Sequence, residues 1–123
     1  MPVTALDVAE MTKGSLKKRF YVVLNFPLAS EEQMMEHIRD HLDYMRRHED
    51  KVFLSGPFIR PGQTIGEGLT VLHTENEEEA LQLMKDEPLI RLGLRRFEIK
   101  LWQVQEGSLS ITVSGDNSTF SLN

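Results

Sequence analysis

The sequence contains no cysteine, which excludes disulfide bonds, thiolate catalysis and zinc sites built on cysteine. It has no apolar run near the ~20 residues that span a bilayer, and no apolar segment near its N-terminus that would serve as a secretion signal. Basic residues are outnumbered, since 14 Lys and Arg stand against 19 Asp and Glu, for a net charge of −5. Binders of nucleic acid or anionic membranes depend on many Lys and Arg contacts. We therefore expect a cytoplasmic protein that binds neither.

The rest of the composition is that of an ordinary globular domain. The 123 residues are 40% hydrophobic and 27% charged, which suffices for one hydrophobic core but not for two. We expect an N-terminal extension at 1–18, in which Thr4 caps a short helix through Met11. A central domain at 19–108 and a C-terminal β-hairpin at 109–123 follow.

Hydrophobic patterning predicts alternating strands and helices in the central domain. The predicted strands are 19–26, 51–55, 69–73 and 95–104. The first helix should run from 31 to about 49 behind an N-cap at Ser30, and the second from Thr74 to a stop at Pro88. Residues 58–68, rich in glycine, form a loop. This β-α-β-β-α-β order predicts an α+β, ferredoxin-like fold with both helices on one face of an antiparallel sheet.

Both faces of the predicted sheet are apolar. We expect the helix-covered face to carry Phe20, Val22, Leu24 and Phe26 of the first strand, with Phe97, Ile99 and Leu101 of the last. The opposite face would then carry Tyr21, Val23, Leu72, Trp102 and Val104. That second face is too apolar to remain in water. A second copy packed against it would cover it, so we expect a homodimer that forms a dimeric α+β barrel.

Among the four histidines, His41 is the best placed for proton transfer. Helical periodicity puts it at the flank of the first helix's apolar stripe, next to Met34, whereas His37 and His48 lie farther toward solvent. An imidazole between helix and sheet can act as general base or acid, and a half-buried histidine without chemistry is the alternative. His37 and His41 are four residues apart and could share a metal ion, but no third ligand follows. We expect no metal and no cofactor.

Two acids, Asp86 and Glu87, precede Pro88 at the end of the second predicted helix. Because both helices lie on one face of the sheet, either carboxylate could point toward His41 and orient its imidazole. A charged surface turn is the alternative.

The segment Gly56-Pro57-Phe58 ends the second predicted strand and begins the loop. Glycine permits close backbone approach and proline fixes the direction of exit, so the segment fits a simple turn or a pocket wall. The Gly56 amide could also donate to an anion. We assign this segment and Met45 to the wall of a small-molecule pocket. Four arginines could pair with a substrate carboxylate, although solvated surface charge explains them equally well: Arg60, Arg91, Arg95 and Arg96.

Five short motifs follow one another in a fixed order. They are HLDYM at 41–45, FLSGPF at 53–58, GEGLTVL at 66–72, DEPLIRLG at 86–93 and FEIKLWQVQEGS at 97–108. Together they resemble the YCII-related (YciI-like) family over about residues 20–108. The resemblance implies a ferredoxin-like subunit in a dimeric α+β barrel, with a site built from a helix histidine and an aspartate before a proline. His41 matches the histidine, Glu87 replaces the aspartate, and Asp86 lies one residue earlier.

The leading hypothesis for function is a small cofactor-independent enzyme. It would be an isomerase or lyase that transfers a proton on a small aromatic-derived or lactone-like metabolite. His41 would transfer the proton, and Glu87 or Asp86 would orient it. The alternative is a non-catalytic homodimer that binds a small molecule or serves as an accessory protein, which would be stabilised by its ligand without forming product.

Overall fold

The computed structural model describes residues 2–14, 18–107, 111–113 and 120–122. The chain divides into two compact units, Arg19–Gln103 and the combination of Met1–Lys18 with Val104–Asn123. Within the described residues, no helix combines the length and apolar character that a membrane span requires.

The smaller unit contains one helix and one strand pair. Helix α1 (Ala5–Met11) begins at the predicted N-cap, where the side chains of Thr4 and Asp7 each accept a hydrogen bond from the other's backbone amide. Strands β5 (Ile111–Val113) and β6 (Phe120–Leu122) pair antiparallel, as a hairpin requires. The predicted turn between them lies outside the described residues.

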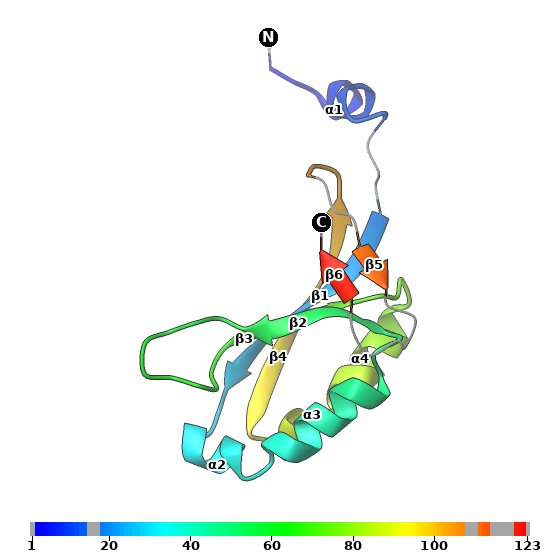
Figure 1. Ribbon diagram of the computed structural model, residues 1–123. Coiled ribbons are helices and arrows are strands. Elements are labelled where there is room, and N and C mark those ends of the chain that lie inside the picture. Colours follow the sequence, from blue (N-terminus) through cyan, green and yellow to red (C-terminus); the bar gives the residue numbers. More distant parts are fainter. Residues whose placement is uncertain (1, 15–17, 108–110, 114–119, 123) are drawn as a thin grey trace. The chain divides into compact units, whose positions relative to one another are not determined.

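The larger unit has the predicted α+β, ferredoxin-like architecture. Its elements are β1 (Lys18–Pro27), α2 (Glu31–Met35), α3 (Ile38–Arg47), β2 (Val52–Pro57), β3 (Gly68–Leu72), α4 (Glu77–Lys85), α5 (Pro88–Arg91) and β4 (Arg95–Val104). The four strands form one sheet in the order β2-β3-β1-β4, and β3 pairs antiparallel with both of its neighbours. Helices α3 and α4 lie on the same side of this sheet (Figure 1).

The first predicted helix is broken in two. It starts behind Ser30 as expected, but α2 ends at Met35 and α3 begins at Ile38, with His37 outside helical geometry. Met34 and Tyr44 are the buried residues of these two helices, and they enter different core clusters. On one unbroken helix, at about 100° per residue, their side chains would point about 80° apart. The break lets each side chain reach its own cluster.

The second predicted helix also differs from expectation. It begins behind Asn76 rather than at Thr74, and it ends at Lys85. Pro88 does not terminate it; instead Pro88 is the first residue of the short helix α5, with Glu87 as its N-cap. Proline is favourable there, because its missing N–H is one that a helix start leaves unpaired anyway.

The predicted orientation of β1 is wrong. Tyr21, Val23 and Leu72 are buried against Tyr44 of α3 and residues of α4, so they lie on the helix-covered face. The side chains that alternate with them lie on the opposite face: Phe20, Val22, Leu24 and Phe26. The pattern failed here because this strand is apolar at nearly every position and therefore does not specify which face is which. In β4 the prediction is confirmed for Phe97 and Ile99, which pack against the core.

Along the strands, the helix-covered face of the sheet changes from apolar to polar. Three rows of paired residues cross β1, β3 and β2: Tyr21, Leu72 and Val52; then Val23, Thr70 and Ser55; then Asn25, Gly68 and Pro57. The first row fills the core under the helices. The later rows bring hydroxyl and amide groups, and at Gly68 no side chain at all. This end of the sheet is therefore the one that can accommodate a ligand.

The loop between β2 and β3 is attached to α2 by residues close to β3. Ile65 is buried against Met34 and Leu89. The backbone amides of Thr64 and Ile65 donate to Glu31 Oε1 at 2.6 and 2.9 Å. These two hydrogen bonds, that of Ile65 first, hold the pKa of Glu31 below its ordinary value of 4.5.

We predict a pH dependence for this attachment. Because the pKa of Glu31 is lowered on folding, its contribution to stability is present above pH 4.5 and is lost as pH falls through the folded-state pKa. In NMR titrations the amide protons of Thr64 and Ile65 should shift upfield with a midpoint below 4.5. Glu31→Gln should abolish this titration and the adjacent Glu32→Gln should preserve it. Amide signals unaffected by acid would contradict the prediction.

Candidate active site

The imidazole of His41 contacts the carboxylate of Glu87. His41 lies in α3, and its Nδ1 is 2.5 Å from Glu87 Oε1. The Glu87 side chain is only 3% exposed and that of His41 17%. A buried carboxylate is costly unless it is paired and hydrogen-bonded. The two side chains therefore form a positioned pair between α3 and α5.

The start of α5 completes the hydrogen bonding of Glu87. Its carboxylate accepts from the backbone amides of Leu89 at 3.2 Å and Ile90 at 3.3 Å, as the N-cap of this helix. The pair is thus a consequence of local sequence, because Pro88 starts a helix and the residue before it must cap the free amides. The Glu-Pro sequence carried this signal, which we interpreted as a helix end.

Of the two acids considered from the sequence, the structure brings Glu87 and not Asp86 to His41. Asp86 is exposed at the end of α4, where its Oδ1 accepts a hydrogen bond of 3.0 Å from Gln82 Nε2. This contact belongs to the outer surface of α4. Of these two acids, Glu87 is therefore the one in contact with His41.

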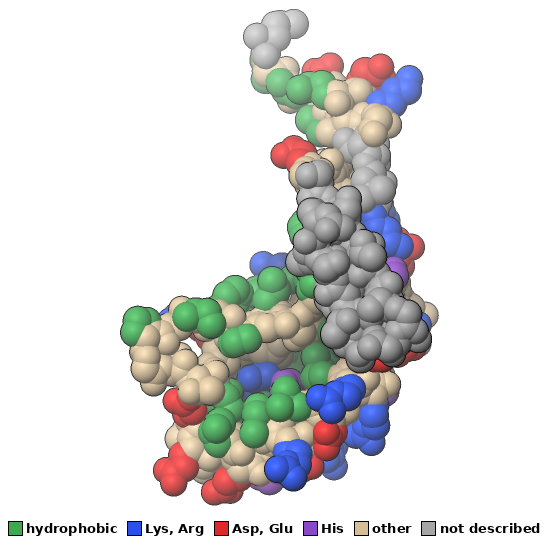
Figure 2. Space-filling model, viewed as in Figure 1, with side chains coloured by type: hydrophobic (Ala, Val, Ile, Leu, Met, Phe, Trp, Pro, Cys, Tyr) green, Lys and Arg blue, Asp and Glu red, His purple; other side chains and the backbone are tan. Residues whose placement is uncertain are grey.

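His41 lines a cavity of about 280 Å³ between α3 and the polar end of the sheet. Met45, Gly56 and Pro57 also line it. Phe58 lines instead an adjoining hollow with Leu54 and Val71, because it follows Pro57 at the point where the chain leaves the sheet. Figure 2 shows the opening between α3 and β2, with histidine and basic surface at its floor and hydrophobic side chains at its rims.

The cavity walls also carry polar groups, of which the sequence singled out only Arg95, as one of four arginines. The hydroxyls of Ser55 and Thr70 lie 2.9 Å apart. Asn25 Oδ1 and Arg95 Nε are buried and have no hydrogen-bond partner among the described residues. Buried polar atoms are paired in most proteins, so unpaired ones beside a cavity mark positions where a ligand can bind. The available signal was the polar residues that interrupt otherwise apolar strands.

Tyr44 of α3 lies close to the His41–Glu87 pair but is unsuited to accept a proton. Burial, followed by the charges of Asp86 and Glu87, raises its pKa to about 12. The hydroxyl therefore stays protonated, and it donates to the Leu83 carbonyl at 2.7 Å. Tyr44 connects α3 to α4 and fixes the helix that carries His41.

The remaining histidines have other surroundings. His48 packs against Tyr44 with ring centroids 4.4 Å apart and the rings tilted by 44°, and His73 lies near Phe20 and Phe53. His37 is the N-cap of α3. Within the part of the chain that the structure describes, no three His, Cys, Asp or Glu side chains are grouped to hold a metal ion.

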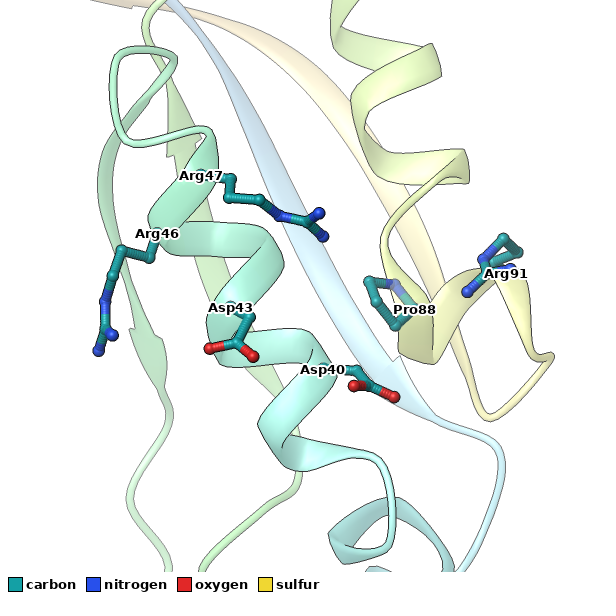
Figure 3. A pocket seen from close by; sticks show the side chains of 6 residues that line it. All are labelled: Asp40, Asp43, Arg46, Arg47, Pro88 and Arg91. Atoms are coloured by element: carbon teal, nitrogen blue, oxygen red, sulfur yellow. The ribbon is translucent and has the colours of Figure 1, made fainter.

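A larger groove of about 740 Å³ lies between α3 and α5 (Figure 3). It is lined by Asp40, Asp43, Arg46, Arg47, Pro88 and Arg91. Figure 3 shows Arg46 pointing away from α5 and Arg47 pointing toward it. Charges of both signs and an open form are typical of a solvated surface, whereas ligand sites enclose their ligand among apolar walls with a few polar groups. We therefore place the candidate site in the smaller cavity at His41.

The sheet order and helix layer define a ferredoxin-like α+β domain, and an imidazole–carboxylate pair beside a cavity is its distinctive feature. The model of the YCII-related domain family matches residues 19–103. The protein therefore belongs to the YCII-related family, which confirms the resemblance drawn from its motifs.

One solved structure shares the fold at low sequence identity. It is the 5-chloro-2-hydroxyhydroquinone dehydrochlorinase TftG from Burkholderia phenoliruptrix AC1100, in complex with 2,5-dihydroxybenzoquinone. The TM-score is 0.58 at 16% identity, over 73% of this chain and 96% of that one. No curated protein matches the chain.

We predict that Glu87 stabilises the fold while its neighbour Asp86 does not. Glu87→Ala removes the cap of α5 and the partner of His41, so it should lower the free energy of unfolding by about 1–3 kcal/mol. Asp86→Ala, at an exposed position, should change it by less than about 0.5 kcal/mol. Urea unfolding measures both. Equal effects of the two variants would contradict the assignment.

Proposed function

We propose that this protein is a small enzyme that transfers a proton on a one-ring, aromatic-derived or lactone-like metabolite, as an isomerase or lyase. The observation that carries the proposal is the contact between His41 Nδ1 and the buried Glu87 carboxylate at the edge of a cavity. Such a pair performs general acid–base chemistry without a cofactor. The proposed roles are proton transfer for His41 and its orientation for Glu87.

The contact with Glu87 determines which ring nitrogen of His41 can accept a proton from a substrate. A carboxylate next to Nδ1 accepts a hydrogen bond from an N–H group there, so in the neutral imidazole Nε2 keeps its lone pair. Nε2 would remove a proton from a carbon next to a carbonyl, and the electron pair of the broken C–H bond would move onto the carbonyl oxygen. Returning the proton to a different carbon gives isomerisation. In elimination this electron pair forms a new carbon–carbon double bond, the leaving group departs with the electrons of its own bond to carbon, and the proton is left on His41.

The cavity sets the size of the substrate. At about 280 Å³ it lies just below the usual range for ligand pockets and suits a molecule of one ring. TftG supports this class, because it is a dehydrochlorinase whose structure holds the single-ring 2,5-dihydroxybenzoquinone. At 16% identity, the likeness extends to the fold and supplies no residue roles.

We predict that His41→Asn strongly slows proton transfer. Purified protein is incubated in D₂O with enolisable one-ring lactones and quinols, and deuterium incorporation at carbon is followed by NMR. The variant should lower the exchange rate by about 10²- to 10⁴-fold. His37→Asn, a matched change outside the cavity, should leave the rate unchanged.

Two outcomes would contradict the proposal. Undiminished exchange in the His41→Asn variant would remove the role of His41. Ligands that raise the melting temperature of the wild-type protein without any exchange would favour a non-catalytic small-molecule-binding protein instead.

The sheet face opposite the helices supports a homodimer as the working form. Its central row consists of Val22, Val71 and Leu54, which pair across β1, β3 and β2. A hollow of about 380 Å³ on this side is apolar except for Lys100 and is bordered by Trp102. The helices of this unit lie on the other side of the sheet and do not cover this face. A second copy packed against it would bury its apolar side chains.

We predict that Leu54→Glu weakens the dimer. The side chain is 37% exposed on this face, and a carboxylate there would be desolvated at an apolar interface. Analytical ultracentrifugation should show the dissociation constant raised by about tenfold or more. Leu92→Glu, at an exposed position after α5, should not change it. A wild-type protein that is monomeric at micromolar concentration would refute the proposed dimer.

A further inference from the structure

The four arginines considered from the sequence have different surroundings. Arg60 pairs with Glu67 at 3.3 Å within the loop, and Arg91 lines the open groove. Arg96 pairs with Glu98 at 3.3 Å, and its guanidinium lies 4.1 Å from the centre of the Phe26 ring. Arg95 alone among these four lines the cavity that His41 lines. The contrast between Arg95 and Arg96 follows from their positions in β4, because neighbouring residues of a strand point to opposite faces.

Arg95 is half-buried, and its Nε is enclosed without a hydrogen-bond partner among the described residues. Burial lowers the pKa of Arg95, while the charge of Glu87 raises it in part. The carboxylate of Glu87 is already engaged by His41 and by the amides of α5. A guanidinium remains charged at neutral pH in any such setting, so an unused N–H here presents positive charge to the cavity.

A second, independent observation lies in the same wall. Asn25 is only 5% exposed, and its Oδ1 also lacks a partner in the described part of the chain. A purely structural asparagine on a helix-covered strand would satisfy this oxygen, since an unpaired buried polar atom destabilises the fold. A donor at Arg95 and an acceptor at Asn25 thus line one cavity, and both are unused.

We propose that Arg95 is the anion-binding residue of this cavity, and that the ligand carries a carboxylate or enolate oxygen for Arg95 together with a hydroxyl group for Asn25. This inference rests on the proposed function in placing the substrate at His41. It deepens that function by giving the substrate class: a one-ring hydroxy compound that is anionic when bound.

The charge of Arg95 also suits the reaction. Removal of a proton from carbon by His41 places negative charge on the conjugated oxygen of the substrate. A fixed cation beside the cavity stabilises such developing charge more strongly than water does. Arg95 would therefore bind the substrate and lower the energy of the enolate formed from it.

The test is a binding experiment with probes matched in shape and different in charge. Isothermal titration calorimetry compares salicylate with salicylamide, and 2,5-dihydroxybenzoquinone with its dimethyl ether. Wild-type protein should bind the anion of at least one pair about tenfold or more tightly than its neutral counterpart. Arg95→Gln should reduce this preference to about twofold or less, because the charge is lost.

Arg96→Gln is the matched control, since it changes the same residue type on the same strand but on the opposite face. It should keep the anion preference of the wild type. If no anion is preferred in either pair, or if Arg95→Gln and Arg96→Gln behave alike, the inference is wrong. A structural role for Arg95 would lower the melting temperature and leave the preference intact, which would also overturn it. Because binding rather than turnover is measured, this failure is distinct from the failure of proton transfer at His41.

Discussion

The carboxylate of Glu87 is the group on which the candidate site depends. It is buried, and its charge is stabilised by the imidazole of His41 on one side and by two amides of α5 on the other. Removing any of these partners would leave a buried charge with fewer hydrogen bonds, which is strongly destabilising. One side chain therefore starts a helix, attaches it to α3 and fixes the orientation of His41. The interactions that position His41 are therefore also interactions that stabilise the fold.

The sheet supplies the other half of the site. Its helix-covered face changes from large apolar side chains at the Tyr21 row to small and polar ones at the Asn25 row. The helices thus pack tightly at one end of the sheet and leave a cavity at the other. Arg95 lines this cavity from β4 and brings positive charge to it, while the carboxylate of Glu87 is paired with His41. The result is an imidazole–carboxylate pair and a cationic side chain around one small space.

The sequence allowed the fold to be predicted because its elements are separated by clear signals, such as Ser30 before α2 and the glycines of the β2–β3 loop. It also indicated His41 and Glu87. The face of β1 could not be predicted, since a strand that is apolar on both sides has no preferred phase. The break at His37 and the start of α5 at Pro88 depend on tertiary packing. Asn25 and Arg95 acquire significance only when the register brings them to the same cavity.

The central claim is that Glu87 holds His41 through Nδ1. The most direct measurement is a long-range ¹H–¹⁵N correlation spectrum of the histidine side chains, which identifies the protonated ring nitrogen. The account predicts that neutral His41 carries its proton on Nδ1 and that Glu87→Gln changes this spectrum while Asp86→Asn does not. A proton on Nε2, with Nδ1 bare in the wild-type protein, would contradict it.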